Sequence, residues 1–276
     1  MNKQFLAAVL LAVAVPVTAH AAVSVSIEIA PPPLPVYVQP VIPAPGYIWT
    51  PGYWRWNAVD ADYFWVPGTW ISPPYVGALW TPGYWGWGNN FYAWHGGYWG
   101  AHVGFYGGVN YGFGYVGHGY AGGYWNGGVF NYNRSVNNVN TTIVHNVYNT
   151  TVVENNTHVS YNGGQGGIAE RPSNEERLAR AEQHTPPTGL QNQHEQQALR
   201  SPQQRASFNH GAPTHMAMAR PAGGQPGGGH PGGQPMHGEG GGRPAHEGGG
   251  REMHAQQQPH GGNPHGGDHR EGNQTH

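Results

Sequence analysis

The stretch "WTPGYW" at residues 49–54 decides the fold of this chain, because the chain repeats it. The same six letters return at residues 80–85, "WVPGTW" occupies residues 65–70, and "WHGGYW" at residues 94–99 keeps the pattern without its proline. The copies begin 16, 15 and 14 residues apart. This spacing is too short for a helical-hairpin repeat and suits one strand pair per copy. The repeat therefore predicts a mostly β fold around a small antiparallel, aromatic-rich sheet.

The order in which the tryptophans pair depends on where the chain reverses. If Pro51 and Gly52 form a tight turn, Trp49 lies opposite Trp54, and the other motifs pair within themselves in the same way. Pro-Gly prefers a type II turn, however, whose twist opposes that of paired strands. The alternative places the reversals between motifs, for example at residues 57–62, and leaves each Pro-Gly as a bulge or corner within a strand. Both registers predict an antiparallel meander with one aromatic face.

The tryptophans of these motifs have two interpretations. Exposed rings would form a platform for flat ligands such as sugar rings, whose C–H faces pack well on aromatic rings. Alternatively, the rings form the core, because the region has few Leu, Ile or Val residues and each ring can bury a large area. The candidate binding residues of the platform interpretation are Trp49, Trp54, Trp56, Trp65, Trp70, Trp80, Trp85, Trp87, Trp94 and Trp99.

Composition changes along the chain and divides it into segments. With 46 Gly, 25 Pro and 9% charged residues, one compact domain over all 276 residues is not expected. The prolines of residues 22–45 predict an extended arm that serves as a spacer or an edge strand. The predicted segments are a signal peptide at 1–21, the Pro-rich arm at 22–45, the tryptophan repeats with a Gly/Tyr-rich β region at 46–128, an Asn/Thr/Val-rich β region at 129–168, short helices at 169–210, and a long disordered Gly/Pro/His-rich tail at 211–276.

The first residues, "MNKQFLAAVLLAVAVPVTAHA", indicate a cleaved secretory signal peptide. They contain Lys3, an apolar run over residues 5–15, and an A-x-A pattern that ends at Ala21. No second apolar run of about 20 residues follows, so no integral membrane span is expected after cleavage. The chain has no cysteine, which excludes a disulfide framework and thiolate metal sites. We expect a protein of the periplasm or a secreted protein.

The remaining segments carry local signals for strands and helices. Alternation from Val139 to Val147 predicts strands joined by Asn-rich turns. Ser173 with Glu176 has the pattern of a capping box, which predicts that a helix begins there. A second helix is expected over residues 191–199, and a short third one after Ser201 and Pro202.

The chain shows no signature of catalysis. Asp60 and Asp62 are the only carboxylates between Glu28 and Glu154, and a glycosidase would need two acids on either side of its substrate. Two acids in "NAVDADY" are more simply turn residues. No nucleophile elbow, phosphate loop or HExxH motif occurs. We therefore expect a protein that is not an enzyme. Arg55 is the only basic residue between 46 and 125 apart from histidines, which excludes nucleic acid as a partner of this region.

Histidines have separate roles in the repeat region and in the tail. His95, His102, His118 and His145 are expected to pack or to hydrogen-bond within the folded part. Tail histidines lie among Gly and Pro, and imidazole suits Cu, Ni or Zn. Their alternative is a solvated tail whose histidine content reflects composition alone. The candidate metal residues are His254, His260, His265 and His269.

The phrases "YIWTPGYWRW", "FWVPGTW" and "LWTPGYWGWG" resemble the YXWGXW, or WXXGXW, repeat of exported bacterial proteins. The runs "HVGFYGGVNYGFGYVGHGYAGGYW", "NRSVNNVNTTIVHNVYN" and "VSYNGGQGGIAERP" are similar to a longer form of that family, so the resemblance covers roughly residues 46 to 210. The resemblance implies a location and an architecture, and it assigns no catalytic residue. Gly96 stands where the other motifs have proline.

These observations favour a non-catalytic, exported cell-envelope protein with an aromatic-repeat module for structure or interaction. Its partners would be a cell-envelope polysaccharide or protein, and the Asn-rich, low-charge strands also allow self-association. No cofactor is expected apart from Cu, Ni or Zn at the tail. Two alternatives are a metal-binding protein that uses the His/Gly-rich tail and a carbohydrate-binding module that uses exposed Trp and Tyr.

Overall fold

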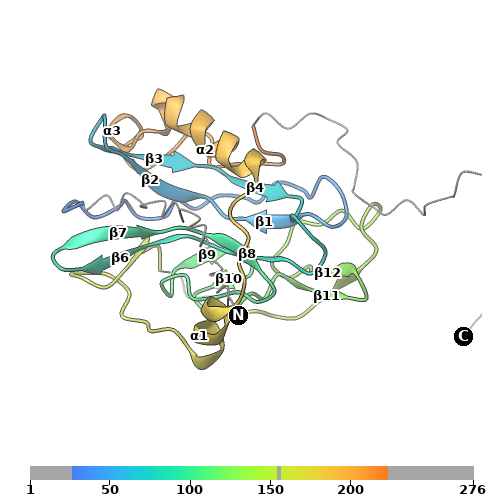
Figure 1. Ribbon diagram of the computed structural model, residues 1–276. Helices are drawn as coiled ribbons and strands as arrows, with labels where there is room; N and C mark the ends of the chain where they lie inside the picture. The colour runs from blue at the N-terminus through green and yellow to red at the C-terminus, as the bar shows by residue number, and fades with distance from the viewer. Residues whose placement is uncertain (1–26, 154–156, 223–276) are drawn as a thin grey trace, which may run out of the picture. The chain divides into compact units, whose positions relative to one another are not determined.

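The computed structural model describes residues 27–153 and 157–222 of the chain. They belong to the first of two units, Met1–Gly228, and the second unit is Gly229–His276. The predicted signal peptide and most of the predicted disordered tail lie outside the described residues. The described chain is mostly β, as predicted, with small sheets of two or three strands and a few short helices (Figure 1).

Two long hairpins form the centre of the fold. The first consists of β1 (Ile48–Thr50), β2 (Tyr53–Asn57), β3 (Asp62–Val66) and β4 (Gly68–Ile71). The second consists of β5 (Leu79–Thr81), β6 (Tyr84–Gly88), β7 (Phe91–His95) and β8 (Tyr98–Gly100). In each hairpin the outer strands pair with each other and the inner strands pair with each other, all antiparallel.

The remaining elements surround these hairpins. The other strands are β9 (Asn110–Gly112), β10 (Tyr115–Val116), β11 (Gly123–Asn126), β12 (Val129–Asn133), β13 (Val147–Tyr148), β14 (Tyr161–Asn162) and β15 (Ala217–Met218). The helices are α1 (Asn174–Ala181), α2 (Gly189–Arg200), the 3-10 helix η1 (Pro202–Gln204) and α3 (Ala206–Asn209). Helix α2 packs along β3, and α1 lies on the opposite side of the hairpins (Figure 1).

The chain reverses between the tryptophan motifs and not at the Pro-Gly pairs. Of the two registers that the sequence allows, the second is therefore confirmed. The first hairpin turns between Asn57 and Asp62, and the second turns at Asn89 and Asn90, which have φ of 52° and 66°. Two successive residues with positive φ match the twist of the flanking strands in a two-residue turn. Each Pro-Gly or Gly-Gly pair instead separates an outer strand from an inner one.

This register pairs each tryptophan with a tryptophan of the neighbouring motif. The ring centroids of the four pairs lie 5.2–5.3 Å apart with interplanar angles of 55–67°. Tilted and edge-to-face geometry is the arrangement that aromatic rings prefer. The pairs are Trp49–Trp70, Trp54–Trp65, Trp80–Trp99 and Trp85–Trp94.

The glycine of each motif lies beneath an indole ring from the opposite arm. Trp65 is opposite Trp54, so its diagonal neighbour on the other arm is Gly52, two residues earlier. A Cβ atom on Gly52 would lie 2.3 Å from the Trp65 ring and 2.9 Å from the backbone nitrogen of Gly68. Gly52 does not have a positive φ, so space and not backbone conformation requires glycine here. The equivalent contacts are Trp49 over Gly68, Trp94 over Gly83 and Trp80 over Gly97.

The proline of the motif is dispensable for this contact. In the fourth motif Gly96 replaces proline, and the ring of Trp80 still packs within 2.5 Å of a Cβ position on Gly97. Gly97 is the glycine of the Trp-x-x-Gly-x-Trp pattern, and Gly96 lies in an open position. The departure of this motif from the others thus leaves the fold of the second hairpin unchanged.

Tyrosines of the Gly/Tyr-rich region fix the hairpins by their hydroxyl groups. The Tyr111 hydroxyl donates to the carbonyl oxygen of Gly83 at 2.6 Å, and the Tyr115 hydroxyl donates to that of Trp49 at 3.2 Å. Burial raises the pKa of both phenols above the ordinary value. A buried phenol with a partner adds apolar area to the core without leaving a polar atom unsatisfied.

The Pro-rich arm covers the core and is neither a free spacer nor an edge strand of a sheet. Leu34 and Ile42 are buried in the aromatic core. The indole nitrogen of Trp54 donates to the carbonyl oxygen of Pro33 at 3.0 Å, and that of Trp70 donates to Pro40 at 2.8 Å. The extended arm makes few ladder hydrogen bonds of its own, so its carbonyls are available to buried indoles.

The Asn/Thr/Val-rich region contains less strand than its alternation predicts. Residues 139–146 form no strand, and only β13 follows at Val147. The Asn140 side chain accepts from the backbone N–H of Thr142, and its carbonyl accepts from Ile143 and Val144. A local Asx turn therefore replaces the predicted strand. The predicted helices are confirmed, including the capping box of Ser173 and Glu176 at α1.

The contact between indole and glycine can be tested by adding one methyl group. Gly52→Ala should lower the free energy of unfolding by about 1–3 kcal/mol, because Cβ overpacks against the Trp65 ring. Gly88→Ala is the control, since nothing lies within 4 Å of its Cβ position. It should raise stability slightly or leave it unchanged. Urea unfolding of both variants measures the difference, and equal stability would contradict the steric role of Gly52.

Candidate functional site

A cavity of about 310 Å³ lies where the corners of the two hairpins meet helix α2, and we call it the corner cavity. The first hairpin contributes residues around Pro51 and Pro67, and the second contributes residues around Gly83 and Gly97. The N-terminal half of α2 forms the third wall. The cavity thus occupies the positions at which the strand ladders are interrupted, and glycine leaves room beside them.

Helix α2 is held to both hairpins. Thr188 caps it, because its hydroxyl accepts from the backbone N–H of Gln191, and the Gln191 side chain accepts from the N–H of Thr188. The same Gln191 oxygen accepts from the indole nitrogen of Trp99 in the second hairpin at 2.8 Å. The N-terminal end of α2 is therefore anchored at the cavity.

An ion pair joins α2 to the first hairpin at the cavity wall. The Nε of Arg55 donates to one carboxylate oxygen of Glu195 at 3.0 Å, and the Tyr53 hydroxyl donates to the other at 2.8 Å. Burial and the nearby Glu195 charge raise the pKa of Tyr53 well above its ordinary value, so the phenol stays protonated as a donor. Arg55 and Glu195 neutralise each other, and this wall is polar without a net charge.

Aromatic rings form the opposite wall. The Tyr53 ring stacks on that of Trp94, with centroids 5.3 Å apart and planes at 21°. The guanidinium carbon of Arg55 lies 5.0 Å from the centre of the Trp94 ring, within the range of a cation–π contact. Trp94 is partly exposed, whereas Trp80, which also lines the cavity, is buried.

His194 connects the cavity to the C-terminal end of the described chain. Its Nε2 donates to the carbonyl oxygen of Pro67 at 2.8 Å, and its Nδ1 accepts from the backbone N–H of Ala222 at 3.2 Å. The accepting Nδ1 identifies the neutral tautomer that carries its proton on Nε2. Burial lowers the pKa of His194, which keeps the ring neutral near neutral pH.

Thr69 places a hydroxyl without a partner at the cavity. Its side chain is 2% exposed, and its Oγ1 has no hydrogen bond to any residue of the described chain. Its backbone carbonyl, in contrast, accepts from the Thr50 hydroxyl at 2.9 Å. Buried hydroxyls almost always have a partner, so an unsatisfied one that lines a cavity indicates that something polar binds there.

A larger hollow of about 550 Å³ lies along the Pro-rich arm. Tyr37, Trp65 and Phe113 form its aromatic side, and residues 134–138 form a polar side. Thr157 and His158 complete its wall, and they follow directly on residues that are outside the described chain. The corner cavity is therefore the better defined of the two.

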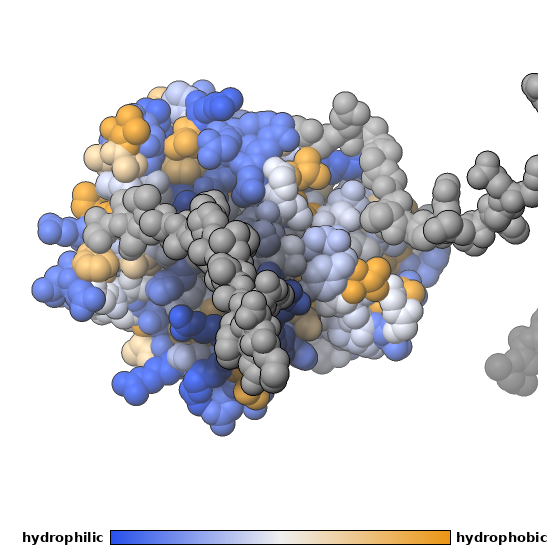
Figure 2. All heavy atoms as spheres, in the orientation of Figure 1, coloured by the Kyte–Doolittle hydropathy of each residue, from blue (hydrophilic) through white to orange (hydrophobic). Residues whose placement is uncertain are grey.

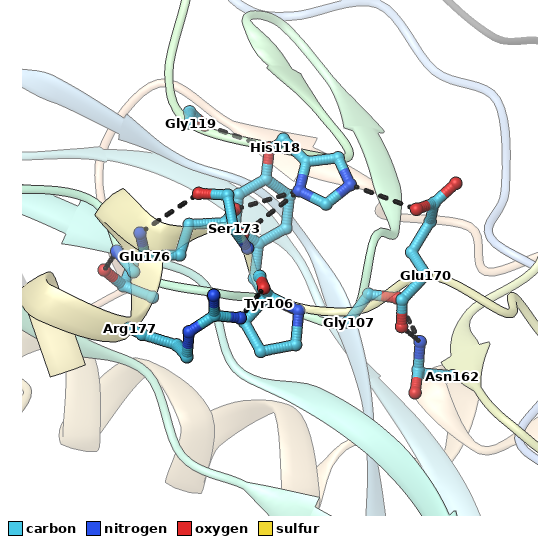
Figure 3. A network of polar contacts seen from close by, with 12 residues as sticks. Tyr106, Gly107, His118, Gly119, Asn162, Glu170, Ser173, Glu176 and Arg177 are labelled. Atoms are coloured by element: carbon cyan, nitrogen blue, oxygen red, sulfur yellow. Dashed lines mark hydrogen bonds and ion pairs between the residues drawn. The ribbon is translucent and has the colours of Figure 1, made fainter.

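A polar network around His118 attaches α1 to the Gly/Tyr-rich region (Figure 3). The Nδ1 of His118 lies 3.1 Å from both carboxylate oxygens of Glu176, and its Nε2 lies 3.5 Å from a carboxylate oxygen of Glu170. Glu176 is buried and also accepts from the backbone N–H of Ser173 in the capping box. The imidazole thus bridges two acidic residues and fixes where α1 begins.

The structure also locates the other histidines predicted to pack or to bond. His95 stacks on Tyr84, with centroids 4.5 Å apart, and burial lowers its pKa. The Nδ1 of His102 lies 2.7 Å from a carboxylate oxygen of Glu182. His145 is exposed. Within residues 27–153 and 157–222 no group of three or more His, Asp or Glu is arranged to hold a metal ion.

The predicted platform tryptophans divide into two sets. Seven are buried and form the core, which is the second of the two interpretations that the sequence allows: Trp49, Trp54, Trp65, Trp70, Trp80, Trp85 and Trp99. Trp56, Trp87 and Trp94 are partly exposed. Of these three, Trp94 lines the corner cavity. Ligand binding by any of them stays a prediction.

The remaining predicted residues lie away from the cavity or outside the description. Asp60 pairs with Arg205 at 2.8 Å near the tip of the first hairpin, and Asp62 accepts from the Ser207 hydroxyl at 2.6 Å. Both acids therefore have structural partners. The candidate metal ligands His254, His260, His265 and His269 lie outside the described residues.

The WXXGXW repeat matches the chain in two copies, at residues 45–70 and 79–99. Each copy corresponds to one of the two hairpins, so four six-residue motifs make two structural repeats. The chain is thus a WXXGXW repeat protein, as its sequence predicts, and the repeat is a structural module. No curated protein and no solved structure matches the chain.

Sequence reasoning missed the polar side of the corner cavity. Thr69, Asn192, His194 and Glu195 come from two segments far apart in the chain, and nothing local indicates that they meet. One signal was present: Thr188 with Gln191 has the spacing of a capping box, which would have placed the start of α2 and the exposed position of Asn192.

The neutral state of His194 predicts a stability that depends on pH. Because its folded pKa is lowered, the unfolded state binds a proton more readily below about pH 6.5, so stability falls as pH decreases through that range. His194→Gln keeps a donor for Pro67 and removes the titration. It should therefore show a smaller loss between about pH 7.5 and about pH 5.5. His145→Gln is the exposed control, and an unchanged slope in His194→Gln would contradict the role of His194.

Proposed function

We propose that this protein is a non-catalytic, exported protein of the bacterial cell envelope, in which the two WXXGXW hairpins form a rigid module for structure and interaction. The observation that carries the proposal is the use of the motif tryptophans. Seven of the ten candidate residues are buried in the core, where they pair across the hairpins and cover the motif glycines. A motif that is used in this way serves first to build a scaffold.

A non-catalytic role is supported by the placement of the acidic residues. Asp60, Asp62 and Glu195 each have a basic or hydroxyl partner. Glu195 is already paired with Arg55 at the corner cavity, which lowers its capacity to act as a general acid. Within the described chain no helix is long and apolar enough to cross a membrane.

An interaction role is supported by the surface around α2. The upper side of the molecule in Figure 2, over α2 and α3, is mainly hydrophilic with isolated apolar residues. A surface of this kind favours polar partners such as envelope polysaccharides over another apolar surface. The corner cavity lies beneath α2 and provides a defined place for such contacts.

Export is tested by cell fractionation. The full-length protein, expressed in a bacterium, should appear in the periplasm or the medium, and its mature chain should begin at Ala22. Ala21→Arg removes the small residue before the cleavage site and should leave an unprocessed precursor. Cytoplasmic protein that still begins at Met1 would contradict export and would leave the structural role of the repeat intact.

The scaffold role is tested by the accessibility of the tryptophans. Most of the emission should be blue-shifted and protected from acrylamide, because the quencher reaches only the partly exposed Trp56, Trp87, Trp94 and Trp125. Replacing Trp87 by Phe should remove quenchable emission, whereas replacing Trp54 by Phe should remove protected emission. Free quenching of all the tryptophans in a folded, β-rich protein would contradict the scaffold role.

A further inference from the structure

We infer that the corner cavity is a binding site for a neutral saccharide. The inference rests on the proposed interaction role and gives that role a ligand class and a location. Four properties of the cavity support it: its size, its lack of net charge, its aromatic wall and its unpartnered buried hydroxyl.

The size of the cavity suits a short saccharide. Its volume of about 310 Å³ lies at the lower end of the range for small-molecule sites. A site of this size holds about one or two sugar rings. The capping of α2 and the paired hairpins hold its three walls in place, so binding would require little rearrangement.

The charge of the cavity favours a neutral ligand. Arg55 and Glu195 are the charged side chains in its wall, and they are paired with each other at 3.0 Å. His194, the remaining titratable imidazole, is held neutral by burial. An anion would compete with Glu195 for Arg55, and a cation would compete with Arg55 for Glu195. A ligand rich in hydroxyl groups has no such conflict.

Aromatic rings and polar groups are combined in the manner that sugars require. Trp94 and Tyr53 offer ring surface to the C–H faces of a sugar. Thr69 supplies the unpartnered hydroxyl, which can both donate and accept. Asn192 lies on the exposed side of α2 at the rim of the cavity, and its amide can bond two neighbouring sugar hydroxyls.

A proline-rich peptide is the competing ligand for a hollow lined with aromatic rings. It would need ring surface and a few donors at the rim, and it would leave the Thr69 hydroxyl unsatisfied. A saccharide is favoured because its hydroxyl groups can satisfy this buried atom.

The test is isothermal titration of the full-length mature protein with chitotetraose, cellotetraose and hexaproline. Thr69→Val removes the hydroxyl and keeps the shape, and Asn192→Ala removes the rim amide from an exposed helix position. Their matched controls are Thr81→Val and Gln193→Ala. Thr81 is a buried threonine of the second hairpin whose hydroxyl accepts from Gly104 and does not line the cavity, and Gln193 is the exposed neighbour of Asn192.

We expect one of the two oligosaccharides to bind and hexaproline to give no heat. Thr69→Val and Asn192→Ala should each weaken the saccharide by about two- to tenfold, and the two controls should bind as the wild type does. Thermal unfolding should show that Thr69→Val is at least as stable as the wild type, because it removes an unsatisfied buried group.

Three results would overturn the inference. They are the absence of binding by both oligosaccharides, saccharide binding that neither cavity variant weakens, and binding of hexaproline in place of the sugars. None of them changes the cell fraction or the acrylamide protection, so failure of the saccharide site is distinguishable from failure of the proposed scaffold.

Discussion

The contact of an indole ring with a glycine on the opposite arm determines how both hairpins are built. An antiparallel pair brings each first tryptophan of a motif opposite the second tryptophan of its partner motif. The diagonal neighbour is then the residue two positions earlier, and a ring as large as indole leaves no room for a side chain there. The Gly-x-Trp half of the motif follows from this geometry. Pro-Gly therefore marks a crowded position in a strand and not a turn.

An aromatic core of this kind must satisfy the polar atoms that its rings carry. The fold meets this requirement with backbone carbonyls outside the strand ladders: prolines of the arm accept from Trp54 and Trp70, and Trp54 itself accepts from Trp85 of the second hairpin. Tyr111 and Tyr115 use hairpin carbonyls in the same way. The Pro-rich arm and the Gly/Tyr-rich region are consequently parts of one core with the repeats.

The local features of the chain could be predicted from its sequence, and the features that depend on packing could not. Strand alternation and the Ser173 capping box have short-range causes, and both are present as predicted. The register was ambiguous because Pro-Gly fits a turn or a corner equally well, although Asn89-Asn90 suits a two-residue hairpin turn. Residues 139–146 misled because an Asn140 turn has the same composition as an Asn-rich strand. The corner cavity needs residues 50–97 and 187–195 together, which no local pattern reports.

The cavity and the scaffold share one physical origin. Proline has no N–H for the ladder and glycine has no side chain, so the hairpin walls are thinnest where the motifs carry these residues. Helix α2 bridges the opening, with Gln191 bound to Trp99 of the second hairpin and Glu195 bound to Tyr53 of the first. The rings on the inner face fix the two arms, and the opposite face receives side chains that need not serve the core. A stable aromatic hairpin thus produces, at its own corner, a recess whose chemistry can vary without loss of the fold.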